Sequence, residues 1–433
     1  MTEFKDRGLV LAFHCVPQNI APEVEAYWAA LREALRVQGQ DLLLITTAVV
    51  KNDSLPHLRL PFELDRYTLD KKISSGRHEH PLIESLQSWY GFSRDKSQLV
   101  YLNVKRFYEQ LLDAIEPAAV LSWQSIHPTS QIVREACLTR GLPWWSCERG
   151  WVRETLMVDS GHNNFMTETT SSLGLHRAYE QYKTNLALIE KYKQKTRALQ
   201  TIERYPKRSK DAEKSIRQGL QLAAGQKIYA LMTHGEPHVG AIPGLYGLQR
   251  QHALEPGQLQ TAIEKVATYL ANRGDYLVVK EHPFNLKYQR TLRTEGLPNT
   301  VTTQSSIDEL DAMVDGYLFT LSTLQFETAL KGKPFGLLSR GPLSGPSQAP
   351  CLHDFDAIDN FFQEIETPKS WQMRSAEIDR KISFYLENFL LDLCEEQLGE
   401  TSRLHARHLQ QFTGLAQTTA WSHLETWLQS MDL

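Results

Sequence analysis

A histidine and a proline, His282-Pro283, stand just after an apolar run of strand length at 276–279, with Lys280 and Glu281 in between. An imidazole in this position can donate a hydrogen bond to a departing phosphate and, once protonated, offset the negative charge that develops there. The proline fixes the backbone of the turn. A hydrogen bond from His282 to loop backbone is the other interpretation, and the residue alone does not decide between the two.

Two hydroxyl residues, Ser322-Thr323, follow a second apolar run at 316–321, where the chain is expected to turn into a helix. The first amides of a helix have no internal partner and carry the positive end of its dipole, so with the two hydroxyls they can hold a phosphate. Glu327 stands one helical turn later on the same side, where it can accept hydrogen bonds from a ribose. The competing interpretation is that Ser322 or Thr323 only caps the helix.

Three carboxylates also follow apolar runs of strand length: Glu148, Asp159 and Glu236. Acidic side chains at the edge of a cleft are candidates for proton transfer or for nucleophilic attack. Basic residues stand beside two of the motifs, Arg149 after Glu148 and Lys280 before His282's turn. We therefore expect charged groups of both signs at the strand ends.

The pattern His234-x-Glu236-x-His238 suggests a metal site at first sight. Gly235 and Pro237 break the helix that a HExxH-type site needs, and no further ligand is evident, so we expect no metal. The chain also lacks GxSxG, Walker and GxGxxG motifs. The sequence therefore does not support a serine hydrolase, a nucleoside triphosphatase or a classical dehydrogenase.

The elements that must position these residues alternate between short apolar runs and segments of helical period, which is typical of parallel α/β sheets. In such sheets ligands bind outside the carboxyl ends of the strands, where all these residues fall. A chain of 433 residues is too long for one core. We predict two Rossmann-like, doubly wound α/β domains facing across a cleft, followed by C-terminal helices, with boundaries at 1–205, 206–375 and 376–433. The expected strands are 8–15, 41–47, 118–123, 143–147, 227–233, 276–279, 316–321 and 334–338.

Composition limits the partners and the location. The formal net charge is −4 and the pI about 6.4, so the charge gives no case for nucleic-acid binding. Five scattered cysteines without CxxC spacing fit a reducing compartment with free thiols. The N-terminus has no signal-peptide pattern, and the longest apolar runs are strand-sized. We expect a cytoplasmic protein, or one peripheral to a membrane.

Two stretches taken together resemble the bacterial capsule polysaccharide biosynthesis family, the KpsS/KpsC-type (LipB-like) Kdo transferases. The first contains Gly-Leu-Pro at 141–143, Cys-Glu-Arg-Gly-Trp at 147–151 and the run 155–163. The second contains Lys-Glu-His-Pro at 280–283, Ser322-Thr323 and Glu-Thr-Ala-Leu-Lys-Gly-Lys-Pro at 327–334. The resemblance covers the chain from about residue 118 to 338 in order.

The resemblance implies a GT-B glycosyltransferase that moves Kdo or a related acidic sugar from a CMP-activated donor to a lipid-linked or capsular polysaccharide acceptor. It implies that the second domain holds the nucleotide sugar and the first the acceptor, with no cofactor and no metal. It also implies that the enzyme acts at the inner membrane, with the capsule export machinery as a partner. The nucleotide-binding set would be Lys280, His282, Pro283, Ser322, Thr323 and Glu327. Glu148, Asp159, Glu236 and His282 would form the catalytic set, and Arg149 or Lys280 would pair with the sugar carboxylate.

The chain departs from the family in two places. Arg153 stands where members often carry proline, and the Phe13-His14-Cys15 strand end is unfamiliar. The alternatives are a CDP-glycerol or other polyol-phosphate transferase, a UDP-sugar transferase, and a non-catalytic glycan-binding subunit on the same fold. Polyol-phosphate transferases usually read Asp-Tyr-Ser-Ser and Phe-Asp where this chain has Leu321-Ser322-Thr323 and Phe326-Glu327, which favours the sugar transferase.

Overall fold

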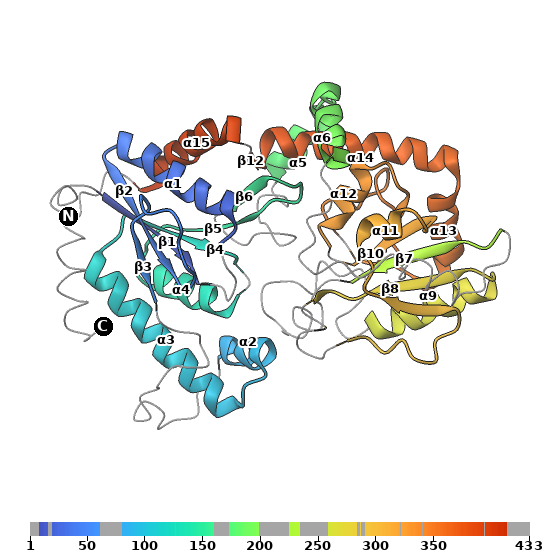
Figure 1. The fold of residues 1–433 in the computed structure, drawn as a ribbon, viewed down its shortest axis with the longest axis horizontal. Helices are drawn as coiled ribbons and strands as arrows, with labels where there is room; N and C mark the ends of the chain where they lie inside the picture. The colour runs from blue at the N-terminus through green and yellow to red at the C-terminus, as the bar shows by residue number, and fades with distance from the viewer. Residues whose placement is uncertain are drawn as a thin grey trace. The chain divides into compact units, whose positions relative to one another are not determined.

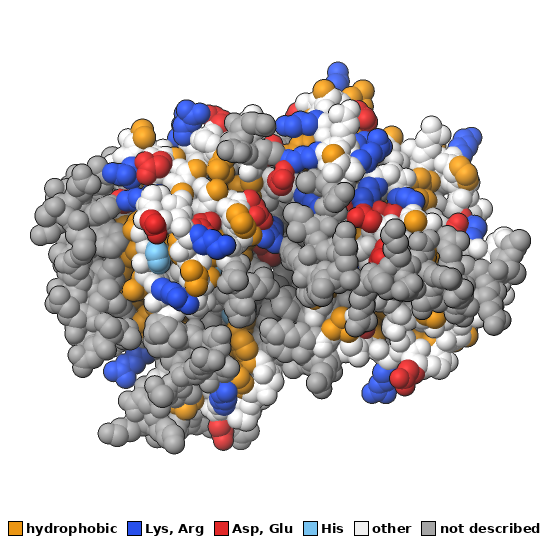
Figure 2. All heavy atoms as spheres, in the orientation of Figure 1, with side chains coloured by type: hydrophobic (Ala, Val, Ile, Leu, Met, Phe, Trp, Pro, Cys, Tyr) orange, Lys and Arg blue, Asp and Glu red, His pale blue; other side chains and the backbone are white. Residues whose placement is uncertain are grey.

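The computed structural model divides into two compact units (Figure 1). Unit 1 comprises residues 1–150, 154–172 and 390–433, and unit 2 comprises 151–153 and 173–389. On the face drawn in Figure 2, acidic and basic side chains of the described residues are interspersed within each unit. The structure describes residues 8–15, 20–60, 80–125, 127–159, 173–198, 225–233, 259–283, 286, 291–320, 322–339, 341–393 and 395–413.

Unit 1 is built on a seven-stranded sheet in the order β12-β6-β5-β4-β1-β2-β3. The strands β1 to β5 run parallel to one another, whereas β6 is antiparallel to both of its neighbours, β5 and β12. The strands are β1 Gly8–His14, β2 Gln40–Thr46, β3 His57–Arg59, β4 Ala119–Trp123, β5 Trp144–Arg149, β6 Thr155–Asp159 and β12 Leu391–Asp392. The helices are α1 Pro22–Val37, α2 Pro81–Tyr90, α3 Arg94–Ile115, α4 Pro128–Thr139 and α15 Glu395–Thr413.

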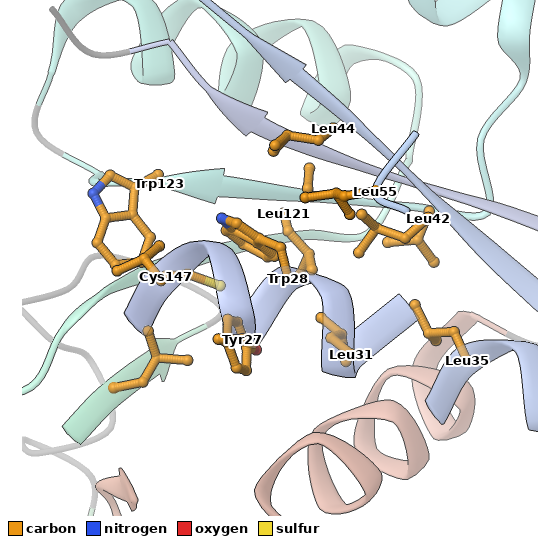
Figure 3. Packing of buried hydrophobic residues seen from close by; sticks show 14 of the residues in the cluster. Tyr27, Trp28, Leu31, Leu35, Leu42, Leu44, Leu55, Leu121, Trp123 and Cys147 are labelled. Carbon is orange, nitrogen blue, oxygen red and sulfur yellow. The ribbon is translucent and has the colours of Figure 1, made fainter. Parts of the chain in front are cut away.

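The core of unit 1 forms where the apolar stripe of α1 meets one face of this sheet (Figure 3). Trp28, Leu31 and Leu35 recur at helical spacing and are fully buried. They pack with strand residues such as Leu42 and Leu121, whose alternate positions face the helix. Burial of both sheet faces explains why these strands read as continuous apolar runs in the sequence.

Unit 2 contains a five-stranded sheet in the order β11-β10-β7-β8-β9, and all of its described strand pairs are parallel. The helices α9 and α13 pack together against one face of it. The strands are β7 Ile228–Met232, β8 Tyr276–Lys280, β9 Thr300–Thr303, β10 Gly316–Phe319 and β11 Phe335–Leu337. The helices are α5 Leu173–Gln181, α6 Leu186–Ala198, α9 Leu259–Asn272, α11 Ile307–Asp311, α12 Leu324–Leu330, α13 Ile358–Glu366 and α14 Pro368–Asn388, with a 3-10 turn, η7, at Phe355–Ala357.

The predicted fold class, an α/β protein with two Rossmann-like doubly wound domains and C-terminal helices, is confirmed by the two sheets. The units differ in extent from the predicted ranges 1–205, 206–375 and 376–433. The helices α5 and α6 belong to unit 2, where the hydroxyls of Tyr182 and Ser383 share a hydrogen bond and Lys193 pairs with Asp379 of α14. The elements β12 and α15 belong to unit 1, where β12 pairs with β6 and α15 packs on α1.

A glycine in β11 allows α13 to approach the unit 2 sheet. A Cβ at Gly336 would lie inside van der Waals contact with the Phe361 ring and 2.6 Å from Ile365 Cδ1. We expect Gly336→Ala to lower the free energy of unfolding by about 1–3 kcal/mol through overpacking. The matched control is Gly399→Ala in α15, where a Cβ meets no described atom within 4 Å; it should raise stability by about 0.5–1 kcal/mol. Calorimetric unfolding that shows the same change for both variants would contradict this account.

Candidate functional site

The carboxyl ends of β8 and β10 flank the carboxyl end of β7 in unit 2. The chain passes from β7 to β8 and β9 on one side, then returns to β10 and β11 on the other, so the strand order reverses at β7. Ligands in open α/β sheets bind at such a reversal, outside the carboxyl ends of the strands. His282 follows β8 and Ser322 follows β10 at this edge.

The turn that carries His282 is fixed by a threonine after β7. The Thr233 hydroxyl donates to Glu281 Oε2 at 3.0 Å and accepts from the His282 amide at 2.9 Å. Glu281 is buried, and its Oε1 accepts from the amide of Leu292 at 2.6 Å. Glu281 therefore has a structural task, whereas the half-buried His282 and Pro283 lie at the strand end.

The side chain of Lys280 makes a hydrogen bond to a backbone carbonyl. From the sequence, Lys280 is predicted to contact the nucleotide or the sugar carboxylate. Its Nζ donates to the carbonyl of Ser305 at 2.6 Å, in the loop between β9 and α11. Burial lowers the pKa of Lys280, and the nearby Glu309 opposes that change. The amine thus helps to hold the loop beside the strand end.

Ser322 and Thr323 begin α12 in different ways. The Ser322 hydroxyl accepts from the Leu324 amide at 3.3 Å, and its carbonyl accepts from Gln325 Nε2 at 2.9 Å, so Ser322 does support the start of the helix. Thr323 occupies the N-cap position in a helical conformation, and its side chain makes no capping hydrogen bond. The capping interpretation therefore accounts for Ser322 and leaves the hydroxyl of Thr323 without that role.

Glu327 of α12 lies between two cationic side chains, those of Arg153 and Lys331. Its Oε2 is 3.1 Å from Arg153 Nε, and its Oε1 is 3.1 Å from Lys331 Nζ. Lys331 also contacts Asp311 at 2.7 Å. The predicted ribose contact of Glu327 stays a prediction, and the pair with Arg153 was not foreseen from the sequence.

Unit 1 has its own reversal of strand order, between β1 and β4. His14 at the end of β1 stacks on Trp123 at the end of β4, with ring centroids 5.0 Å apart and an interplanar angle of 24°. Burial lowers the pKa of His14 to about 3, and Arg149 adds to this effect, so the imidazole is neutral near pH 7. Its Nδ1 is buried without a hydrogen-bond partner among the described residues. The sequence prediction missed this pair, although the strand-end position of His14 was a signal.

The hairpin of β5 and β6 brings two predicted carboxylates to one face of the unit 1 sheet. Glu148 lies opposite Met157, and Asp159 lies opposite Ser146, so Glu148 and Asp159 are diagonal neighbours, a relation that corresponds to about 7–8 Å. Arg149 points to the other face, where its guanidinium pairs with Glu23 at 3.0 Å. The third carboxylate, Glu236, lies outside the described residues, as does the His234/His238 pattern around it.

Burial raises the pKa of Glu148 from an ordinary 4.5 to about 7, although Arg149 partly opposes this shift. The residue keeps some exposure, but its Oε2 is shielded and has no hydrogen-bond partner among the described residues. A carboxyl group with a pKa near neutrality can both give and take a proton at physiological pH. Glu148 is thus the carboxylate in the described ranges best suited to acid–base work.

Two further properties concern metals and membranes. Within the described ranges, no three histidine, cysteine or acidic side chains gather as metal ligands would. None of the helices in those ranges combines the length and the apolar character needed to cross a bilayer.

Comparisons with known proteins give distant structural likenesses. No protein-family model and no curated protein matches the chain. Similar solved structures include a glycosyltransferase from Rickettsia africae ESF-5, at 11% identity and a TM-score of 0.39 over 94% of this chain and 98% of that one. The UDP-GlcNAc 2-epimerase from Neisseria meningitidis bound to UDP-GlcNAc has 11% identity and a TM-score of 0.39, over 93% and 99%. The β Kdo 2,7 transferase KpsC of Thermosulfurimonas dismutans has 14% identity and a TM-score of 0.40, over 77% and 98%. Similarity this low leaves function to be argued from the chain's own residues.

The raised pKa of Glu148 makes stability depend on pH. The unfolded chain releases this proton at about pH 4.5 and the folded chain only at about pH 7, so unfolding becomes easier as pH rises through that window, by about 3 kcal/mol in total. We expect Glu148→Gln to remove this dependence, so the stability of the variant relative to wild type should increase between pH 4.5 and 7. The exposed Glu84→Gln in α2 is the control and should stay within about 0.5 kcal/mol of wild type. A Glu148→Gln difference that is flat across this window, measured by denaturant unfolding, would show that Glu148 titrates normally.

Proposed function

We propose that the protein is a nucleotide-sugar-dependent glycosyltransferase whose donor site lies at the carboxyl edge of the unit 2 sheet. The observation that carries this proposal is the placement of His282 and Ser322-Thr323 at the ends of β8 and β10, on either side of β7. An imidazole and hydroxyl groups at a strand reversal are suited to hold the phosphate of an activated donor and to stabilise it as it departs.

The finer assignment is to a CMP-activated acidic sugar, Kdo or a relative, and to a lipid-linked or capsular polysaccharide acceptor. It is supported by the ordered motifs at 141–163 and 280–334. In this proposal the imidazole and the hydroxyls offset the charge on the phosphate without a metal ion. The reaction would take place in the cytoplasm, at the inner membrane.

The acid–base group in this proposal is Glu148, because its pKa of about 7 lets it change protonation state during the reaction. Transfer with retention of configuration also needs a carboxylate nucleophile. Asp159, on the same sheet face as Glu148, and Glu236 are the candidates for that role.

The choice of nucleotide can be tested with calorimetric titration of CMP, CDP and UDP against the full chain. We expect CMP to bind, and UDP to bind at least about tenfold more weakly, a difference of about 1.4 kcal/mol. Binding of UDP without CMP would reject the Kdo-type donor and favour a UDP-sugar transferase. Preference for CDP would favour the polyol-phosphate transferase, and CMP binding without any turnover of CMP-Kdo would favour a glycan-binding subunit.

The phosphate role of His282 predicts a large effect on chemistry. His282→Ala should lower the rate of CMP release from CMP-Kdo by about a hundredfold or more, since loss of such an electrostatic partner normally costs that much. His57→Ala, at an exposed histidine of β3, is the matched control and should leave the rate unchanged. If His282→Ala retains a rate within a few-fold of wild type, His282 has no such role.

A further inference from the structure

Arg153 belongs to a three-residue segment, Trp151–Arg153, that lies in unit 2 although the sequence on both sides of it lies in unit 1. Trp151 is buried and its ring stacks on Phe326 of α12, with centroids 5.3 Å apart and an interplanar angle of 16°. The same ring system also makes an edge-to-face contact with Tyr385, at 4.9 Å between centroids. Because Trp151 and Val152 are both buried, the backbone that carries Arg153 is held against α12.

The guanidinium of Arg153 is oriented by a single contact. Its Nε lies 3.1 Å from Glu327 Oε2, and the Glu327 side chain is only 10% exposed. Within the described part of the chain, neither terminal nitrogen of Arg153 makes a hydrogen bond. The Arg153 side chain keeps 28% of its exposure, so these nitrogens are not sealed in the core.

A guanidinium presents its N–H donors as a planar fork that matches carboxylate and phosphate oxygens in pairs. With Nε held by Glu327, the edge formed by the two terminal nitrogens is left for a second oxyanion. Thr323 precedes Glu327 by four residues, so the two side chains lie on the same side of α12. The uncommitted hydroxyl of Thr323 therefore lies on the helix face that holds Arg153.

The two basic residues predicted from the sequence to meet the sugar carboxylate, Lys280 and Arg149, already have hydrogen-bond partners. Lys280 donates to the carbonyl of Ser305, and Arg149 pairs with Glu23 in unit 1. Of the three, Arg153 is the one whose terminal nitrogens both lack a hydrogen-bond partner among the described residues.

We infer that Arg153 binds an oxyanion of the donor through its terminal nitrogens, and that Glu327 is the positioning residue that aims the guanidinium. The oxyanion is the nucleotide phosphate or the sugar carboxylate, which share the chemistry that the fork recognises. This inference rests on the proposed donor site, and it gives Glu327 a task beside the predicted ribose contact.

The test compares wild type, Arg153→Gln and Arg153→Lys by calorimetric titration with cytidine, CMP and CMP-Kdo. Loss of a charge-assisted, two-point contact should weaken binding by about tenfold to a hundredfold in Arg153→Gln. Arg153→Lys, which keeps the charge and loses the fork, should lie between. If the phosphate is the partner, affinity falls for CMP and not for cytidine. If the carboxylate is the partner, CMP affinity is unchanged and only that for CMP-Kdo falls.

Equal affinities of all three proteins for CMP and CMP-Kdo would overturn the inference and leave the donor site standing. Failure of wild type to bind CMP and CMP-Kdo would instead overturn the assignment of a CMP-activated donor, on which this inference rests. The role of Glu327 is tested by a double-mutant cycle with Glu327→Gln. In a positioning role, Glu327→Gln lowers the affinity for CMP or CMP-Kdo relative to that for cytidine when Arg153 is present, and leaves this ratio unchanged in Arg153→Gln; additive effects on the ratio would overturn that role.

Discussion

Parallel hydrogen bonding between β7, β8 and β10 is the constraint on which the candidate donor site depends. Because these strands run in one direction, their carboxyl ends meet at one edge of the sheet, where Met232 of β7 has Lys280 and Phe319 as its neighbours, 48 and 87 positions away in the chain. The reversal of strand order at β7 leaves this edge open between the connections that follow β8 and β10. Thr233 then uses one hydroxyl to fix the turn that carries His282.

Unit 1 applies the same geometry with different chemistry. At its strand reversal the neutral imidazole of His14 stacks on Trp123, and Glu148 at the end of β5 holds its proton to about neutral pH. Both effects have one cause, since burial disfavours the charged form of an acid and of a base alike. The edge therefore contains a neutral imidazole and a carboxyl group that is only partly ionised near pH 7.

Much of the fold could be predicted from the sequence, because strands buried on both faces leave continuous apolar runs. The positions of His282 and Ser322 at strand ends follow from this pattern. The pair of Arg153 and Glu327 could not be predicted, because it joins residues 174 positions apart through a tertiary contact that leaves no local periodicity. The packing partners of α5, α6 and α15 could not be predicted for a similar reason. An amphipathic helix shows that it covers a surface, and its sequence does not say which one.

The packing of β12 and α15 in unit 1 has a consequence for synthesis on the ribosome. The helix α1 is translated long before α15, the helix that packs on it and the last described element. Tyr27 hydrogen-bonds His405, and Ala406 joins the core around Trp28. Until then, one flank of α1 has no partner, and the β6 edge lacks β12. Unit 1 therefore cannot complete its packing in vectorial order, and a nascent chain must keep this apolar flank from aggregating while all of unit 2 is translated.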